Sequence, residues 1–452
     1  MVNMPVVLTG QRWPLPLMEG LTPDNGTLRA ADRLAREGQV RASGRLAGDD
    51  SWLLWAAFPE GRRPDALASV LLPQFSVTCT CGGARLPCRH VLALLHLDPS
   101  ANPAADAEPP PWATARLEAG RRAARPPAAL PDSDDRIATA AAGLAELARW
   151  LGDQLDRGLA ALPAAGPRPW HAAADRLADA YAPAAARELR QLATLPGSGG
   201  DWPERLLPRL GRLALLADAF GRLDALPPAE RADVLAAAGL PPRPGDDRVS
   251  DTWLALGRRQ LVDGGQRQTR TWLRGLSSGR WALLEAYQPA KRLEGLCLPT
   301  GARFSGELAF APGARPLPAQ PVDGLRLEMP APEDDPPGDP DNLSGHDGFP
   351  SLDIAAAVAD YAAARAANPW LRLLPMHLSG VFVEPAPAGW RLRDRGGRLL
   401  PLPPRYGHGW ALLALAGDRP LTLCGEYDGA TLTPLSVYHD GWRDPAAWKA
   451  LP

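Results

Sequence analysis

Residues 79–90 read Cys-Thr-Cys-Gly-Gly-Ala-Arg-Leu-Pro-Cys-Arg-His, and this stretch decides how the front of the chain folds. It gathers four side chains able to bind a metal, in a chain with five cysteines and seven histidines in all. Three thiolates and one imidazole close a tetrahedral structural zinc site and leave no coordination position open for a substrate. Buried structural cysteines or a redox pair fit this spacing less well. We therefore predict one structural zinc ion with four ligands: Cys79, Cys81, Cys88 and His90.

The local sequence also predicts how the two ligand pairs are presented. Residues 51–58 and 70–78 read as extended runs, so the motif follows a strand, and Gly82-Gly83 lets the chain curl after it. The second pair precedes the apolar run 91–95, so we expect it at a helix N-terminus, where the macrodipole favours thiolate over thiol. Two strands, a loop and a helix bury little apolar surface. We therefore expect zinc binding to supply the folding energy of this module, which should be disordered without metal.

This spacing, Cys-X-Cys followed by a short loop and Cys-X-His, resembles the SWIM-type zinc finger, and residues 87–95 resemble its usual ending. The resemblance implies that the same four residues bind zinc. Beyond the finger, residues 143–151, 201–207 and 279–284 are similar to those of a bacterial family of uncharacterised SWIM-finger proteins. Gly82 stands where relatives often have proline, which bears on the loop shape and not on the ligands. SWIM fingers are implied to act in DNA binding or in protein–protein contact, and the resemblance does not choose between them.

Length and charge bound the class of protein. A chain of 452 residues with 45% apolar residues is long enough for about three domains with packed cores. The net charge of -2 argues against a protein that binds a polyelectrolyte such as nucleic acid over its whole surface, so any such binding should be local. The two remaining cysteines, Cys297 and Cys424, lie far apart, so we expect a reduced, cytoplasmic location. Residues 1–20 do not resemble a secretory signal, and no apolar run is long enough to span a membrane.

We predict an α+β multidomain protein, with a small zinc-stapled ββα SWIM module, a central helical bundle and antiparallel β-rich C-terminal regions. Leucines stepping by three and four predict the bundle, in one stripe from Leu144 to Leu162 and another from Leu206 to Leu223. The predicted parts are a zinc finger domain (1–98), a Pro/Ala-rich linker (99–135), a helical domain (136–250), an antiparallel β region (251–328), an acidic Pro-rich linker (329–349) and a C-terminal helix with a β-rich domain (350–452).

Other candidate motifs favour structural explanations. Residues 275–279 match the Gly-X-Ser-X-Gly pattern of hydrolases, but a strand rather than a helix is expected after them, which favours a hairpin turn. Near the end of the chain, four acids and histidines fall in turn-rich sequence, and turn chemistry explains them: His408, Glu426, Asp428 and His439. The phosphate-loop, metalloprotease and dinucleotide-binding patterns are missing from the sequence, so we predict a protein that is not an enzyme.

Basic and aromatic residues flank the motif. The aromatic residues Trp52, Trp55 and Phe75 could stack on bases, whereas the alternative is a solvated charged rim over core aromatics. We rank nucleic-acid binding first, protein–protein adaptor function through the same zinc-stapled surface second, and enzyme activity third. Neither a membrane nor a small-molecule substrate is expected as a partner. The residues that could contact nucleic-acid phosphates are Arg62, Arg63, Arg85 and Arg89.

Overall fold

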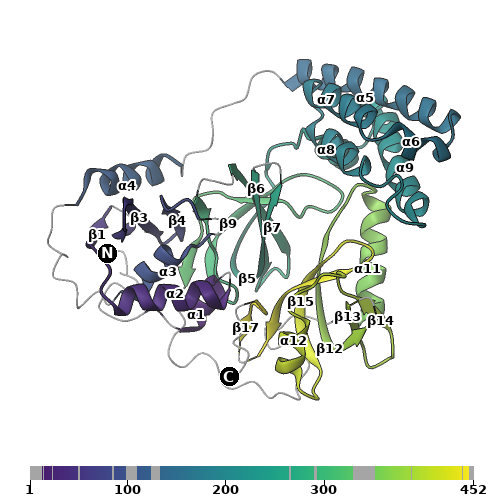
Figure 1. Cartoon of the computed structure of the whole chain (residues 1–452). Helices are drawn as coiled ribbons and strands as arrows, with labels where there is room; N and C mark the ends of the chain where they lie inside the picture. The colour runs from purple at the N-terminus through teal and green to yellow at the C-terminus, as the bar shows by residue number, and fades with distance from the viewer. Residues whose placement is uncertain are drawn as a thin grey trace.

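The structure is a computed structural model that describes residues 13, 15–22, 24–48, 51–83, 86–97, 109–123, 133–263, 266–289, 293–328, 352–387, 389–439 and 441–446. The predicted acidic linker 329–349 lies outside the described residues. Within them the chain is α+β, as predicted, with helices gathered between residues 133 and 238 and antiparallel sheets before and after (Figure 1). No helix among the described residues has the length and apolarity needed to cross a membrane.

The N-terminal sheet has the strand order β1-β2-β3-β4-β8. Its strands are β1 (Ala42–Ala47), β2 (Trp52–Glu60), β3 (Arg63–Leu72), β4 (Ser76–Cys79) and β8 (Leu293–Leu296). Helices α1 (Leu15–Leu21), α2 (Asn25–Arg36) and α3 (Arg89–His96) contribute to a core on one face, and α4 (Pro111–Ala123) packs on the other face against Leu53, Trp55 and Leu71. Helix α4 lies within the predicted linker 99–135.

The extended run predicted over residues 70–78 is wrong, because the chain turns within it. Pro73, which has no N–H to donate to a ladder, begins the turn, and Phe75 sits in the left-handed region with φ of 56°. Strands β3 and β4 then pair antiparallel, with Leu71 opposite Ser76 and Ala68 opposite Cys79. The first zinc ligand is therefore the last residue of a short inner strand.

The small ββα module predicted from the motif is part of a larger unit. Cys79 lies opposite Leu293 in the register of β4 and β8, so a strand from more than 200 residues later completes the finger sheet. The core that contains Cys79 and Cys88 also contains Trp253, Leu273 and Phe304 of the central sheet. Apolar packing therefore supports the finger in addition to any metal, which the motif alone did not indicate.

The central sheet has the strand order β10-β9-β5-β6-β7, with β11 also pairing with β9. The strands are β5 (Arg248–Asp263), β6 (Gln266–Gly275), β7 (Trp281–Pro289), β9 (Arg303–Phe310), β10 (Ala319–Pro321) and β11 (Arg326–Glu328). These strands make up the antiparallel β region predicted over residues 251–328. Residues 275–279 form the β6–β7 turn, in which the Ser277 and Ser278 N–H groups donate to the Asp251 carboxylate. Since a strand follows, the hydrolase pattern is a hairpin turn, as predicted.

The helical part consists of α5 (Ser133–Asp156), α6 (Leu162–Ala165), α7 (Arg168–Asp179), α8 (Pro183–Leu192), α9 (Trp202–Gly221) and α10 (Pro228–Ala238), with short 3-10 turns at Leu159–Ala161 and Leu223–Ala225. The stripe from Leu206 to Leu223 is buried along its length, as predicted. The first stripe is buried from Leu144 to Leu151 and again at Leu162, but Leu155 within it is 53% exposed, so the stripe is interrupted where α5 ends.

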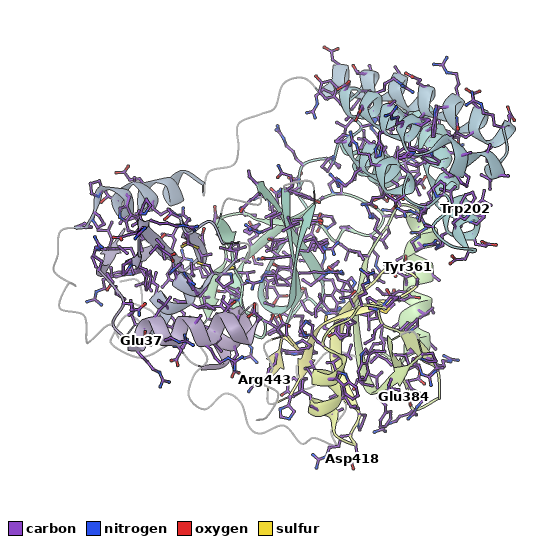
Figure 2. The ribbon with its side chains drawn as sticks, in the orientation of Figure 1. Glu37, Trp202, Tyr361, Glu384, Asp418 and Arg443 are labelled. Carbon is purple, nitrogen blue, oxygen red and sulfur yellow. The ribbon has the colours of Figure 1, made fainter. Side chains whose placement is uncertain are left out.

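The C-terminal part packs α11 (Ile354–Ala367) and α12 (Gly409–Ala416) on a sheet with the order β14-β13-β12-β15-β16-β17. Its strands are β12 (Leu374–Ala386), β13 (Gly389–Arg393), β14 (Leu399–Pro401), β15 (Leu421–Tyr427), β16 (Leu432–Tyr438) and β17 (Trp442–Arg443). Arg443 pairs with Glu19 of α1, and Figure 2 shows Arg443 where the first helices meet the last strands. The two ends of the described chain are therefore joined.

One prediction for the C-terminal acids and histidines is wrong. Asp428 does sit in a turn, where its carboxylate accepts from the N–H groups of Ala430 and Thr431. Glu426, however, lies on β15 with its side chain 0% exposed, and it accepts from Arg259, Arg270 and the indole of Trp272. A buried carboxylate requires such partners, so Glu426 is a buried ion-pair residue between two sheets and not a turn residue.

Candidate metal centre

The first ligand pair lies where β4 ends. After Cys79, the Thr80 side chain accepts from the N–H of Leu67 and its own N–H donates to the Leu67 carbonyl, so pairing continues for one residue. Gly82 then adopts φ of 65°, a backbone region that residues with a Cβ rarely occupy, and nothing lies within 4 Å of where a Cβ would stand. The chain therefore curls directly after Cys81, as the glycine pair predicted.

The second ligand pair lies at the start of α3. Cys88 is the N-cap residue with extended backbone, and Arg89 and His90 open the first turn. The apolar run 91–95 that follows is fully buried, which fixes the helix against the sheet. The N-terminal N–H groups of a helix stabilise negative charge, so the Val91 N–H lowers the pKa of the Cys88 thiol, although the neighbouring Cys81 and burial outweigh this effect in the metal-free site.

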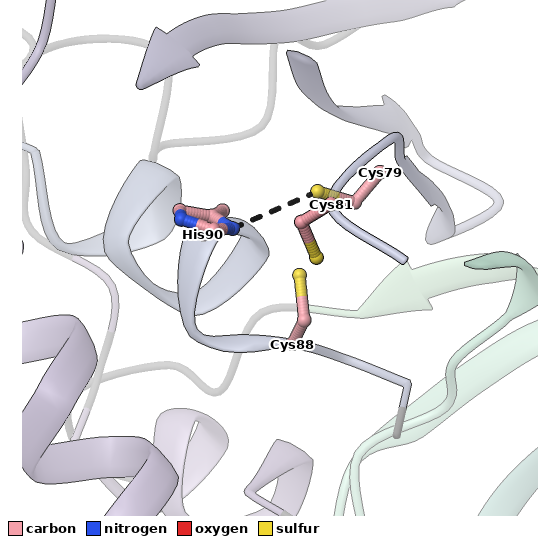
Figure 3. Close-up of side chains that lie close together, drawn as sticks. All are labelled: Cys79, Cys81, Cys88 and His90. Atoms are coloured by element: carbon pink, nitrogen blue, oxygen red, sulfur yellow. Dashed lines mark hydrogen bonds between the residues drawn. The ribbon is translucent and has the colours of Figure 1, made fainter. Parts of the chain in front are cut away.

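The ligand atoms of all four predicted residues lie within 4.8 Å of one another (Figure 3). The Nδ1 atom of His90 is 3.9 Å from the Sγ atom of Cys79. His90 is 1% exposed and Cys79 and Cys88 are buried, whereas Cys81 is partly exposed, so the group is open to solvent only on the Cys81 side. The fold therefore brings together the four side chains that the spacing singled out.

Hydrogen bonding assigns the two ring nitrogens of His90 to different roles. Nε2 lies 2.8 Å from the Oε1 atom of Glu60 at the end of β2, while Nδ1 faces the sulfurs. A ligating histidine commonly donates its second N–H to a carboxylate, which fixes the tautomer and the ring orientation. The same Glu60 oxygen accepts from Arg89 at 2.7 Å. The Phe58 ring, 5.2 Å from the imidazole, closes one side of it.

The pKa values of the three cysteine thiols differ, because the thiols form hydrogen bonds with one another. The pKa of Cys81 is lowered, chiefly because the Cys79 thiol donates a hydrogen bond to it and the Cys88 thiol adds a second. The pKa of Cys79 is raised, first by its hydrogen bond with Cys81. A hydrogen bond with Cys79 lowers the pKa of Cys88, but the hydrogen bond with Cys81, followed by burial, outweighs it and raises that pKa to about 11. Three closely packed cysteine sulfurs are suited to a divalent cation, which binds all three as thiolates with release of protons.

The comparisons with known proteins agree with this geometry. Residues 70–97 match the SWIM zinc finger family model. The chain carries a SWIM zinc finger. Residues 135–238 match the model for the SWIM-associated four-helix bundle domain, which covers α5 to α10. No curated protein and no solved structure matches the chain. The four ligands of the SWIM finger complete a tetrahedral set and fit one structural zinc ion.

The arginines predicted near the SWIM finger differ in their surroundings. Arg62 and Arg63 are exposed at the β2–β3 turn, and Arg85 lies outside the described residues. Arg89 is exposed as well, but it pairs with Glu60. The predicted aromatic stacking partners are not accessible: Trp55 is 3% exposed against Trp112, and Phe75 is 0% exposed against Trp13, while Trp52 is partly buried in the sheet.

Two residues that support the SWIM finger could not be found from its motif. Glu60 is thirty positions before His90, and Gln260 is more than 170 positions after Leu86, whose main chain it holds. Glu60 ends an alternating strand next to a glycine turn, which predicts an exposed hairpin residue. Gln260 reads as an ordinary polar strand position. The contacts follow from the pairing of β2 with β3 and from the packing of β5 on the finger loop.

Proposed function

We propose that the protein is a non-enzymatic binding protein whose β2–β3 hairpin contacts the phosphates of a nucleic acid. The observation that carries the proposal is the position of Arg62 and Arg63. Both are exposed at a turn whose preceding residue, Glu60, contacts Arg89 and His90 of the zinc site. Within the described part of the chain, no carboxylate forms an ion pair with Arg62 or Arg63, so both guanidinium groups can meet phosphate.

The zinc ion would have a structural role in this function. Glu60 links the hairpin to His90, and zinc binding fixes His90, so metal binding holds the arginine pair in place. The four ligands leave no open coordination position, which agrees with a protein that is not an enzyme. Two phosphate contacts give modest affinity, so binding should be salt-dependent and largely independent of sequence.

The test is a titration of zinc-loaded, full-length protein against fluorescent duplex and single-stranded DNA and RNA at several salt concentrations. Replacing both arginines, Arg62→Gln with Arg63→Gln, should weaken binding and reduce the slope of log affinity against log salt by roughly 1.8 on duplex DNA. The control removes two exposed arginines of the helical part, Arg157→Gln with Arg168→Gln, and should leave the slope unchanged. Arg89 is unsuitable for this test, because its loss would also disturb Glu60.

Binding that is absent at about 50 mM salt, or equally reduced in both double variants, would refute the nucleic-acid proposal. The adaptor alternative requires an accessible apolar surface on the finger. In the described N-terminal part, helices cover both faces of the sheet, so no apolar surface at the finger supports that alternative. A pull-down in which Arg62 and Arg63 prove essential for a protein partner, with no nucleic acid bound, would favour the adaptor.

A further inference from the structure

A cleft of about 400 Å³ lies between the central sheet and the C-terminal part, away from the zinc site. Its walls come from the β6–β7 turn, residues 315–317, α11 and β12. Figure 1 shows these elements where the central sheet meets the C-terminal part. This volume is within the range of small-molecule sites, which often lie between structural units.

The lining of the cleft has an excess of positive charge. Three guanidinium groups line it, those of Arg274, Arg280 and Arg315, against the single carboxylate of Asp360. Asp247, outside the lining, offsets Arg280, so one positive charge remains among these five groups. A charge held between two protein layers acts through a lower dielectric than in water, so its attraction for an anion is strengthened.

Two of the guanidinium groups are held in fixed orientations. Both oxygens of Asp360 accept from one nitrogen of Arg315, each at 2.8 Å. Both oxygens of Asp247 accept from the two terminal nitrogens of Arg280, at 2.7 and 2.8 Å. A guanidinium carries five N–H donors, so each arginine keeps donors that its carboxylate does not take. Orientation in advance reduces the entropy lost when a ligand binds.

The third guanidinium lies on an aromatic ring, and apolar residues beside it form one wall of the cleft. The Arg274 guanidinium lies 4.8 Å from the centre of the Trp281 ring, and burial lowers its pKa. His377 also lines the cleft, and burial followed by the Arg274 charge lowers its pKa to about 4, so it adds no positive charge at pH 7. The remaining lining is apolar: Pro316, Leu317, Leu352 and Pro375. Such a wall suits a ligand with an apolar body.

We propose that this cleft binds a small organic anion, in which a carboxylate or phosphate group meets Arg274 and Arg315 and an apolar body packs on Trp281 and Leu317. Guanidinium groups bind carboxylate and phosphate through paired N–H donors, so both groups share the required chemistry. The ligand would bridge β6, β7 and residues 315–317, and Asp360 of α11 would lie next to it through its hydrogen bonds with Arg315.

Calorimetric titration of the full-length, zinc-loaded protein tests this site with three anions and one neutral compound. The anions are benzoate, adenosine monophosphate and inorganic phosphate, and benzamide is the neutral analogue of benzoate. Binding of benzoate or of the nucleotide, more tightly than benzamide and inorganic phosphate, would support an organic anion site, and the preferred anion would distinguish carboxylate from phosphate. Binding of none of the anions, or equal binding of benzamide, would overturn the proposal.

Variants connect the binding to the cleft. Arg274→Gln should weaken the binding anion at least tenfold, and Arg315→Lys, which keeps the charge but loses the paired donors, should also weaken it. The matched control Arg303→Gln removes an exposed arginine from β9 of the same sheet and should leave the affinity unchanged. Thermal unfolding of each variant monitors folding, and Arg315→Lys provides the result if Arg274→Gln does not fold. Equal loss of affinity in all three variants would contradict the assignment.

Discussion

The side-chain amide of Gln260 holds both main-chain polar groups of Leu86, two residues before the zinc ligand Cys88. Its Nε2 atom donates to the Leu86 carbonyl at 2.6 Å, and its Oε1 atom accepts from the Leu86 N–H at 3.3 Å. Alternation along β5 gives neighbouring residues opposite directions. Arg258, on the same side, donates to the Leu21 carbonyl, whereas Arg259 pairs with Glu426 of the C-terminal sheet. One strand therefore connects the zinc loop, α1 and the last sheet.

Replacing Gln260 with leucine should destabilise the protein and weaken zinc binding together. The Leu86 N–H and carbonyl would lose their partners, at a cost of about 1–3 kcal/mol in the free energy of unfolding, and the loop that positions Cys88 would loosen. Urea unfolding and competition for zinc with a chromophoric chelator measure the two effects. Gln39→Leu, at an exposed position on the N-terminal surface, is the control. Unchanged zinc affinity in Gln260→Leu would show that the hydrogen bonds between Gln260 and Leu86 do not support the metal site.

Glu60 should tune the zinc affinity through His90. Removing the carboxylate in Glu60→Ala frees the His90 ring and should weaken zinc binding by about 10–100-fold, whereas Glu60→Gln, which keeps an acceptor oxygen, should lose less. Nitrogen NMR of the zinc-bound protein should show a proton on Nε2 of His90 in the wild type. The control Asp65→Ala removes a carboxylate that pairs with Arg41 in the same sheet. Equal zinc affinities in all four proteins would rule out the positioning role of Glu60.

Zinc removal should open the finger locally and leave the rest of the chain folded. The sequence alone predicted a module that is disordered without metal, but the finger strands share their core with the central sheet and β8 pairs with β4. A chelator should release one zinc per chain, after which hydrogen exchange should accelerate in residues 79–96 and remain unchanged in residues 135–238. The variant Cys88→Ser, without chelator, should give the same pattern. Simultaneous loss of protection in both regions would show that the metal stabilises the whole chain.

A local sequence pattern predicts only those features whose residues lie close together in the chain. The four ligands lie within residues 79–90, and most of the helical stripe from Leu206 to Leu223 follows one helix, so spacing alone predicted both. Leu155, part of the stripe predicted from Leu144 to Leu162, is exposed because the leucine pattern continues to a position near the end of α5 that faces solvent. Glu426, like Glu60 and Gln260, depends on strands far apart in the sequence. The periodicity of one sequence predicts which face of a helix or strand a residue occupies. It does not predict which strand, distant in the sequence, covers that face.

Glu426 provides the sharpest test of the packing between the last two sheets. Its fully buried carboxylate accepts from Arg259 at 3.1 Å, Arg270 at 2.8 Å and Trp272 at 3.0 Å. In Glu426→Gln the two guanidinium groups lose their counter-charge, and removing one partner of a buried ion pair costs about 3–5 kcal/mol in the free energy of unfolding.

Urea unfolding of Glu426→Gln can be compared with Glu384→Gln, in which the more exposed carboxylate pairs with Arg391 and Arg393 on the same sheet. The control should change stability little, because solvent screens its charges and competes for its hydrogen bonds. If the two variants are equally stable, water must reach Glu426, and the sheets do not pack as described. If Glu426→Gln alone is destabilised, the buried ion pair between β5, β6 and β15 holds the central sheet and the C-terminal sheet together.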